Sequence, residues 1–366
     1  MTAIRKRTWA DSRGEAQQAW LVDYRDAAGK RRFKQFARKK DAEAWSTQAA
    51  WQVTQGTHTP DAQSITVADA AELWVRQAAA EKLERSTIEA YESLARLHVV
   101  PYLGGVKLSR LTRPIIEKYR DELVSSRSRA MAAKSVRALS SILTEAQRQG
   151  LVTQNVASKV KVKRPSRDEH KVEIPTKEEV RALLDAADRD FRPMLMTAVV
   201  TGLRASELRG LRWSDIDLKA ATITVSRRAD RWGLIGRPKS KAGHRTVPIP
   251  QMLVRELREW KLRCPKSSLG LAFPNSKGEV LDHMNVLRRR YRPTQERAGL
   301  PGKYSFHTLR HAAASAWIKQ GIDLKRLQVW IGHENIQLTL DTYGHLLVDK
   351  EGDAALIAKA EADLFG

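Results

Sequence analysis

Hydrophobic and polar positions alternate near the start of the chain and then change to a helical spacing. Trp20, Val22 and Tyr24 occupy alternate positions, and the glycine turn DAAGK leads into a second run, RRFKQF. This alternation predicts a hairpin, with KRTWA before it as a third strand. The apolar positions of KKDAEAWSTQAAWQV then repeat at helical spacing. Residues 1–60 are therefore predicted to form a small three-stranded sheet with one helix.

Residues 64–160 show helical spacing throughout. Their apolar stripes predict four helices with short connections, an all-α unit. Ser86 and Glu89 have the spacing of a capping box and predict a helix that begins after Ser86. Residues 161–175 have no periodicity and carry a dense basic run, which predicts a linker.

Residues 176–366 mix the two patterns. Thr176 and Glu179 form a second candidate capping box, and two alternating runs, ATITV and RTVPIP, are separated by a loop with glycines. The remainder is helical in pattern, including a tail helix near the C-terminus. The sequence thus predicts a multidomain protein whose last domain, residues 176–366, is mixed α+β and mainly helical.

The charge of the chain indicates a polyanionic partner. Its 366 residues include 65 Lys and Arg against 42 Asp and Glu, a formal net charge of +23. Nucleic acid, either DNA or RNA, is the first candidate, because no strongly apolar face that would favour a membrane surface stands opposite the basic residues. The chain has no run long enough for a membrane span and no signal peptide, so we expect a cytoplasmic protein. With Cys264 alone, intrachain disulfides and multi-cysteine zinc sites are excluded.

Basic residues gather in three places that we expect to contact DNA: the second strand of the predicted hairpin, RRFKQF, with the turn before it; the start of the last helix of the helical unit; and the linker. The residues are Lys30, Arg31, Arg32, Lys34, Lys134, Arg137, Lys161, Lys163 and Arg164. The alternative for the strand is a solvated edge, where lysines prevent aggregation.

Several cations could form a pocket for a phosphodiester. Arg204 and Glu207 are three residues apart in TGLRASELRGL, so the carboxylate can orient the guanidinium. His307 and Arg310 have the same spacing in HTLRH, and Lys241 lies in the turn SKAG. Taken alone, each has an ordinary interpretation, such as a surface ion pair or a solvated turn lysine. Together they could hold phosphate oxygens and stabilise a pentavalent transition state.

Tyr343 lies between two histidines in IGHENIQLTLDTYGH. It could be a packed aromatic residue, part of a metal site, or a nucleophile activated by nearby cations. A zinc hydrolase would use His307 and His311, which are four apart. However, Thr308 replaces the glutamate that such a motif needs, and nearby arginines would repel a metal cation. No metal site is expected.

The order Arg204, Lys241, His307, Arg310, His333 and Tyr343 resembles the tyrosine recombinase (phage integrase) family. TGLRASELRGLRWSDID, FHTLRHAAAS and WIGHENIQLTLDTYGH each resemble one of its motif boxes. The resemblance is strong over residues 176–350. It is weaker over the helical unit, which is similar to the family's core-binding domain, and over the N-terminal sheet, which is similar to an arm-binding domain.

The resemblance implies a reaction that forms a covalent link to DNA. Tyr343 would attack the scissile phosphate and give a 3′-phosphotyrosine and a free 5′-hydroxyl. Arg204 and Arg310 would hold the non-bridging oxygens, and His333 would donate a further hydrogen bond. Glu207 would hold Arg204 in place.

The resemblance also assigns the proton transfers. Lys241, rather than the nearby Lys239, would protonate the leaving oxygen, and His307 would handle the tyrosine proton. This chemistry uses no metal and no nucleotide cofactor. The expected partners are core and arm DNA sites, three further copies of the chain in a tetramer on two sites, and DNA-bending accessory and excisionase proteins.

Two other functions are compatible with parts of the pattern. A type IB topoisomerase uses a similar pocket but no partner site, and the arm-like sheet argues against it. A DNA-binding protein without strand cleavage would not need six filled active-site positions. We therefore expect a site-specific recombinase that integrates or excises a mobile element or prophage.

Overall fold

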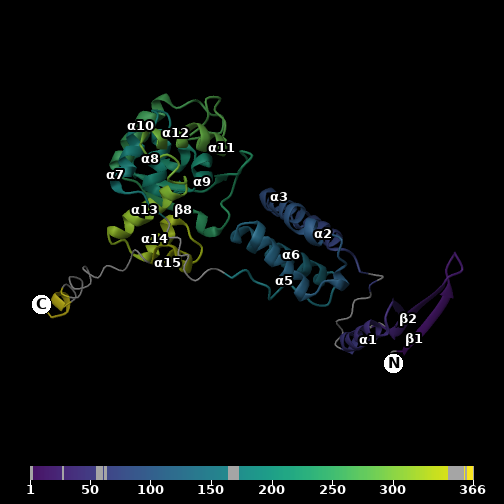
Figure 1. Ribbon diagram of the computed structural model, residues 1–366. Helices are drawn as coiled ribbons and strands as arrows, with labels where there is room; N and C mark the ends of the chain where they lie inside the picture. The colour runs from purple at the N-terminus through teal and green to yellow at the C-terminus, as the bar shows by residue number, and fades with distance from the viewer. Residues whose placement is uncertain are drawn as a thin grey trace. The chain divides into compact units, whose positions relative to one another are not determined.

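The structure is a computed structural model that describes residues 3–26, 29–54, 61, 64–163, 173–344, 358 and 361–365. The chain divides into two compact units, residues 1–169 and 170–366 (Figure 1).

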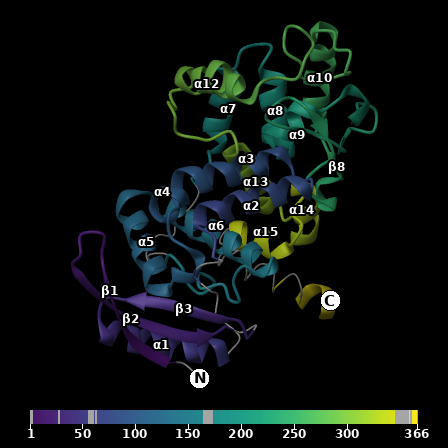
Figure 2. The ribbon, with the colours of Figure 1, turned by 90° about the vertical axis from the view of Figure 1, so that its right-hand side faces the viewer.

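The N-terminal part of the first unit is a sheet with one helix on it. Its strands β1 (Ala3–Ala10), β2 (Ala16–Arg25) and β3 (Arg31–Phe36) are antiparallel in the order β1-β2-β3. Helix α1 (Lys39–Thr54) covers one face, where the Trp45 ring lies 5.0 Å from that of Tyr24 and 5.7 Å from that of Phe36 (Figure 2). The predicted strands and helix are confirmed.

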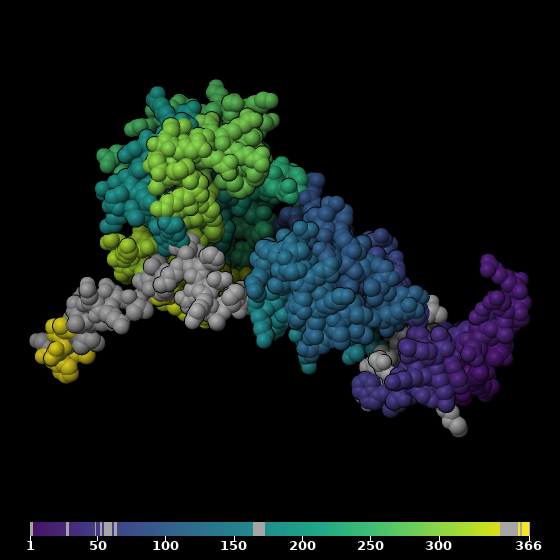
Figure 3. All heavy atoms as spheres, in the orientation of Figure 1, coloured from purple at the N-terminus to yellow at the C-terminus, as the bar shows by residue number. Residues whose placement is uncertain are grey.

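The rest of the first unit is helical. It contains α2 (Val67–Ala80), α3 (Arg85–Leu94), α4 (Val100–Leu103), α5 (Arg113–Ser126) and α6 (Arg129–Arg148), with a π-helical turn, η1 (Ala95–Val99), and a 3-10 turn, η2 (Leu108–Arg110). The long helix α6 supplies much of the core through Val136, Leu139, Ile142 and Leu143, all nearly inaccessible to solvent. These helices form a continuous body in the space-filling view (Figure 3).

One predicted helix start in this unit is wrong. Helix α3 begins at Arg85, and its N-cap residue Glu84 makes no side-chain cap. Ser86 therefore lies inside the first turn and is not the N-cap residue, and the Glu89 carboxylate accepts a hydrogen bond from Arg85 Nε at 3.2 Å. An i,i+4 ion pair has replaced the cap that the spacing suggested.

The second unit surrounds a small antiparallel sheet with helices. The sheet has the order β4-β5-β8 and is accompanied by a two-stranded ribbon, β6-β7. The strands are β4 (Ile216–Asp217), β5 (Thr222–Val225), β6 (Arg228–Ala229), β7 (Ile235–Gly236) and β8 (Arg245–Pro248). The helices are α7 (Lys177–Asp185), α8 (Arg192–Thr201), α9 (Ala205–Gly210), α10 (Gln251–Arg263), α11 (His283–Asn285), α12 (Arg292–Arg297), α13 (Thr308–Lys319), α14 (Leu324–Ile331) and α15 (Ile336–Tyr343). The short turns are η3 (Trp213–Asp215), η4 (Lys241–Gly243) and the π-helical η5 (Val286–Tyr291).

The capping box at the start of this unit is confirmed. Glu179 N donates to Thr176 Oγ1 at 3.2 Å, and Thr176 N donates to Glu179 Oε2 at 2.8 Å. The core joins apolar residues of α8, the sheet and α10, such as Leu195, Ile223 and Leu257. The predicted fold class, a multidomain chain with a mainly helical α+β last domain, is confirmed.

Two expectations about organisation stay predictions. The division near residue 60 separates parts that lie in one compact unit. Most of the predicted tail helix lies outside the described residues, of which 361–365 are helical. Across the described part of the chain, no helix is long and apolar enough to cross a membrane.

Candidate active site

The ion pair between Arg204 and Glu207 is built into the start of helix α9. Arg204 is the N-cap residue, and its backbone N–H donates to Glu207 Oε2 at 2.8 Å. The Arg204 side chain returns to the same carboxylate, with Nη1 2.8 Å from Oε1. Glu207 is 3% exposed, whereas the Arg204 side chain is 36% exposed. The carboxylate is therefore a buried anchor for a partly exposed arginine.

Arg245, which no sequence motif indicated, completes this anchor from strand β8. Its Nη1 and Nη2 donate to the two Glu207 carboxylate oxygens at 3.1 and 2.9 Å. Its Nη1 also donates to Gly243 O at 3.1 Å, within the turn that carries Lys241. The Arg245 side chain is 1% exposed. A single buried arginine thus connects Glu207 to the lysine turn.

Three arginines converge on the C-terminus of helix α14. Arg245 Nε donates to Trp330 O at 2.7 Å, Arg310 Nη2 donates to Ile331 O, and Arg204 Nη2 donates to Gly332 O at 3.0 Å. The last carbonyls of a helix have no partners within the helix and carry partial negative charge, so guanidinium groups are suitable partners. These bonds position Arg204 and Arg310 beside the segment that leads to His333.

Gly332 is required at this junction. Its φ of +70° ends α14 in the left-handed conformation, which favours glycine. A Cβ at this position would lie 2.9 Å from Arg245 Nη1 and 3.0 Å from Ala242 O. The close approach lets Arg245 and the backbone of the lysine turn pack directly against the end of α14.

The histidines and Tyr343 lie against this arginine cluster. Tyr343 is 1% exposed and packs with Ala314, Leu327 and Ile331. Its hydroxyl is 2.9 Å from His311 Nδ1, and its ring is nearly parallel to that of His333. His333 Nδ1 bonds Thr339 Oγ1 at 2.9 Å, which leaves its other nitrogen for a substrate.

His307 and His311 occupy successive turns at the start of α13, and their ring centroids are 5.2 Å apart. Within the described residues, no group of three or more His, Cys, Asp or Glu side chains is arranged to hold a metal ion.

The electrostatics of the site favour an anion. Burial and the charges of Arg310 and Arg204 lower the pKa of both His307 and His333 to about 4, so both are neutral at pH 7. Burial alone would raise the pKa of Glu207, but Arg245 and Arg204 lower it to about 2. Three arginines therefore face one carboxylate, and a bound phosphodiester would supply some of the missing negative charge.

Lys241 stands apart from these contacts. It begins the 3-10 turn η4, directly before β8, and is exposed. Lys239 is exposed two residues earlier. The structure therefore brings Arg204, Glu207, His307, Arg310, His333 and Tyr343 together, and it ties the backbone of the lysine turn to them through Arg245.

The basic residues expected to contact DNA on β3 divide between the two faces of the sheet. Arg31 is exposed beside Phe33, which is 56% exposed, and it forms a two-pronged ion pair with Asp23. Lys34 points to the other face, 4.8 Å from the Trp45 ring centroid, and is 3.8 Å from Asp61. Side chains alternate along a strand, so the basic run does not form a single charged face.

The other members of the basic set occupy different positions. Arg32 pairs with Asp26 at 2.9 Å, and Lys30 is exposed. On α6, Lys134 and Arg137 are exposed one turn apart. In the linker, Lys161 and Lys163 are exposed, and Arg164 lies outside the described residues.

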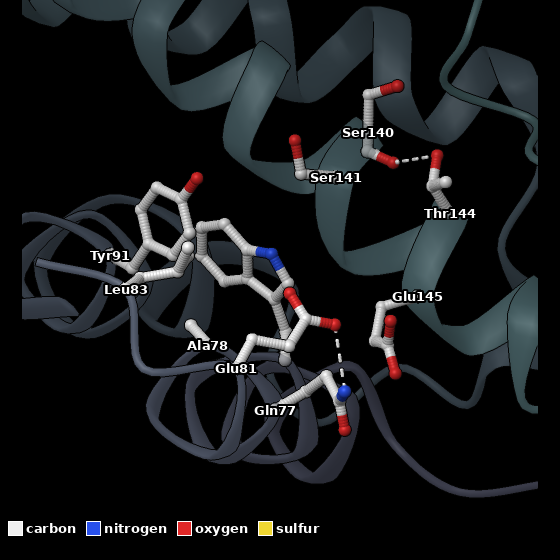
Figure 4. Close-up of a pocket in the computed structure, with 10 residues that line it drawn as sticks. Gln77, Ala78, Glu81, Leu83, Tyr91, Ser140, Ser141, Thr144 and Glu145 are labelled. Carbon is white, nitrogen blue, oxygen red and sulfur yellow. Dashed lines mark hydrogen bonds between the residues drawn. The ribbon is translucent and has the colours of Figure 1, made fainter. Parts of the chain in front are cut away.

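A pocket of about 250 Å³ lies in the helical unit, between α2, α3 and α6. Its two carboxylates already have partners: Glu81 accepts from Gln77 at 2.8 Å (Figure 4), and Glu145 accepts from Arg148 at 2.7 Å. No cationic side chain lines this pocket, so it offers no group that would bind phosphate. The cluster around Tyr343 is the better candidate for the active site.

Comparison with known proteins identifies relatives of this chain. Residues 174–350 match the phage integrase family, and residues 66–124 match the phage integrase N-terminal SAM-like domain. A tyrosine recombinase XerC-like protein from Caldanaerobacter subterraneus subsp. tengcongensis is 27% identical, over 90% of this chain and 92% of that protein. The ICEBs1 integrase of Bacillus subtilis is 25% identical, over 70% of this chain and 73% of that protein.

Solved structures show the same fold. The Tn1549 transposon integrase in complex with transposon right end DNA matches with a TM-score of 0.69 at 20% identity, covering 81% of this chain and 99% of that one. The lambda integrase tetramer bound to a Holliday junction matches with a TM-score of 0.61 at 20% identity, covering 90% and 95%. Taken with the two family matches, these findings place the chain in the phage integrase family of tyrosine recombinases.

Proposed function

We propose that this protein integrates or excises a mobile element or prophage by cutting and rejoining DNA through a 3′-phosphotyrosine at Tyr343. The observation that carries the proposal is the position of the Tyr343 hydroxyl beside a cluster in which positive charge exceeds negative charge. Among the residues that the structure describes, Arg204 and Arg310 each donate two of their five side-chain N–H groups. The remaining donors can bind the non-bridging oxygens of a scissile phosphate.

The other side chains complete the reaction. His333, held by Thr339, donates to a phosphate oxygen through its second nitrogen. Lys241 protonates the leaving 5′ oxygen from its exposed turn. Because the phosphotyrosine conserves the energy of the phosphodiester, a 5′-hydroxyl from a second duplex can reverse the attack and exchange strands.

The proposed partners follow from this reaction. Two duplexes require four active sites, so we propose a homotetramer on two core sites, as in the lambda integrase tetramer bound to a Holliday junction. The N-terminal sheet is proposed to bind arm sites, and DNA-bending and excisionase proteins would set the direction of recombination. The reaction would take place on DNA in the cytoplasm.

A nicked duplex from the end of the mobile element tests the proposal. Loss of a short fragment beside the nick prevents rejoining, so the wild-type protein should accumulate covalently attached DNA. A topoisomerase would also attach, but it would relax a plasmid without a second site, whereas this protein should form recombinants only when two sites are present. A protein that binds the duplex and never attaches would contradict the proposal.

A Lys241→Ala variant should cleave an ordinary duplex about 10²–10⁴-fold more slowly, because the leaving alkoxide loses its proton donor. The variant should recover most of its rate on a duplex with sulfur in place of the leaving 5′ oxygen, since a thiolate leaves without a proton. Lys239→Ala is the matched control and should retain the wild-type rate on both substrates. If Lys239→Ala, and not Lys241→Ala, cleaved the ordinary duplex slowly and recovered its rate on the sulfur-containing duplex, Lys239 would be the proton donor.

DNA affinity should fall steeply with salt, because a chain of net charge +23 releases counterions when it binds. If it contacts on the order of ten phosphates, affinity should drop about 10³–10⁵-fold between about 50 and 200 mM salt. A Lys134→Ala/Arg137→Ala variant should reduce the slope of log affinity against log salt by about two. An unchanged slope would show that these two residues do not contact phosphate.

A further inference from the structure

The hydroxyl of Tyr343 has a specific partner, His311, that lies outside the set of residues assigned above. His311 Nδ1 and Tyr343 Oη are 2.9 Å apart, and the ring centroids are 5.6 Å apart. His311 lies in the first turns of α13, directly after Arg310, so the rigid helix that positions the phosphate-binding guanidinium also positions this imidazole. The contact is thus fixed from two helices, α13 and α15.

We infer that His311 is the group that accepts the Tyr343 proton when Tyr343 attacks the scissile phosphate. The inference rests on the proposed function and names a further catalytic residue for it. It differs from the expectation that His307 handles this proton.

The protonation states of the two groups suit this transfer. Burial raises the pKa of Tyr343, so the phenol keeps its proton at neutral pH. Burial and the charge of Arg310 lower the pKa of His311, so its imidazole is neutral there. A neutral imidazole with its proton on Nε2 offers a lone pair at Nδ1, and the phenol donates to it.

The other groups around His311 have different positions. His333 commits its Nδ1 to Thr339 and lies nearly parallel to the Tyr343 ring, with 6.4 Å between centroids. His307 precedes His311 by one turn on α13 and experiences the charges of Arg310, Arg204 and Glu207. These surroundings place His307 with the phosphate-binding groups.

The proposed step balances in protons and bonds. As the bond from Tyr343 Oη to phosphorus forms, the phenol proton moves to His311 Nδ1 and produces an imidazolium. The bond from phosphorus to the 5′ oxygen breaks, and that oxygen takes a proton from the Lys241 ammonium. Rejoining reverses both transfers. The imidazolium is disfavoured beside Arg310, so its formation also favours return of the proton and rejoining.

The test is the rate of a single cleavage turnover on the nicked duplex from about pH 5.5 to 9, with the full chain. His311→Asn retains a polar atom near the position of Nδ1 and can hold the phenol, but an amide cannot take its proton. We expect His311→Asn and His311→Ala to cleave about 10²–10³-fold more slowly at pH 7. Their rates should rise about tenfold per pH unit, because hydroxide must remove the proton. The wild-type rate should level off once His311 is neutral.

The controls separate this inference from the proposed function. Equal DNA affinity of each variant and the wild type shows that the fold is retained. A wild-type rate and pH profile in His311→Asn would overturn the inference, because hydrogen bonding alone would then be sufficient. Failure of the proposed function would look different, since the wild-type protein itself would form no covalent complex. If the cleavage rate of His307→Asn rose tenfold per pH unit while that of His311→Asn did not change with pH, His307 would be the proton acceptor.

Discussion

A Tyr343→Phe variant is expected to bind its DNA site with wild-type affinity and to form no covalent adduct and no recombinants. The substitution removes the attacking oxygen and leaves the ring in its place among Ala314, Leu327 and Ile331. It also removes the hydrogen bond to His311. A typical intramolecular hydrogen bond contributes about 1 kcal/mol to the free energy of unfolding. Stability should therefore change little while cleavage disappears.

Gel electrophoresis under denaturing conditions measures the adduct, and a mobility shift measures binding. The matched control is Tyr291→Phe, a tyrosine that is 2% exposed in the same unit and whose hydroxyl lies 3.4 Å from Ser305 O. It should retain cleavage, which shows that loss of a buried hydroxyl is not by itself inactivating. An adduct formed by Tyr343→Phe would disprove the assignment of the nucleophile.

An Arg245→Met variant is expected to lose about 3–5 kcal/mol of stability in the second unit, because it leaves the Glu207 carboxylate buried without its main partner. Arg204 remains, but its side chain is partly exposed and bonds only one carboxylate oxygen. Arg204 should also lose its fixed orientation, so we expect cleavage to fall about 100-fold or more at temperatures where the variant is folded.

Urea unfolding measures the change in the free energy of unfolding. Arg255→Met, at an exposed position on α10, is the control and should change stability by less than about 0.5 kcal/mol. The stabilising effect of a carboxylate whose pKa is lowered is present above its ordinary value of 4.5 and is lost as pH falls toward about 2. The difference between wild type and Arg245→Met should therefore be largest near neutral pH and shrink as pH falls, because the unpaired Glu207 carboxyl of the variant is relieved by taking up a proton. A loss no larger than that of Arg255→Met would refute the role of Arg245.

Periodicity was sufficient to predict most of the elements. The alternation at Trp20, Val22 and Tyr24 and the capping box at Thr176 correspond to real features, since both express local geometry. The box at Ser86 failed because the helix begins before it, at Arg85, and the Arg85 guanidinium competes for Glu89. Such a competition depends on side-chain conformations, which spacing does not determine.

The two residues that were missed left signals of different quality. Arg245 points to the buried side of β8, at alternate positions with the buried Val247 and Ile249. A charged residue on the apolar side of a strand indicates a buried partner of opposite charge. That partner, Glu207, is 38 residues away, so only the fold could identify it. His311 was considered as a metal ligand because of its spacing from His307. Its contact with Tyr343 joins two helices that are far apart in sequence, and no local pattern encodes it.

Mass spectrometry of the covalent complex tests the central claim most directly. After the nicked duplex is cleaved and the DNA is digested to a short remnant, the protein is cut into peptides and the modified residue is located. We predict a single adduct in which the 3′-phosphate of the remnant is esterified to Tyr343. An adduct on any other residue, or a link to a 5′-phosphate, would contradict the account.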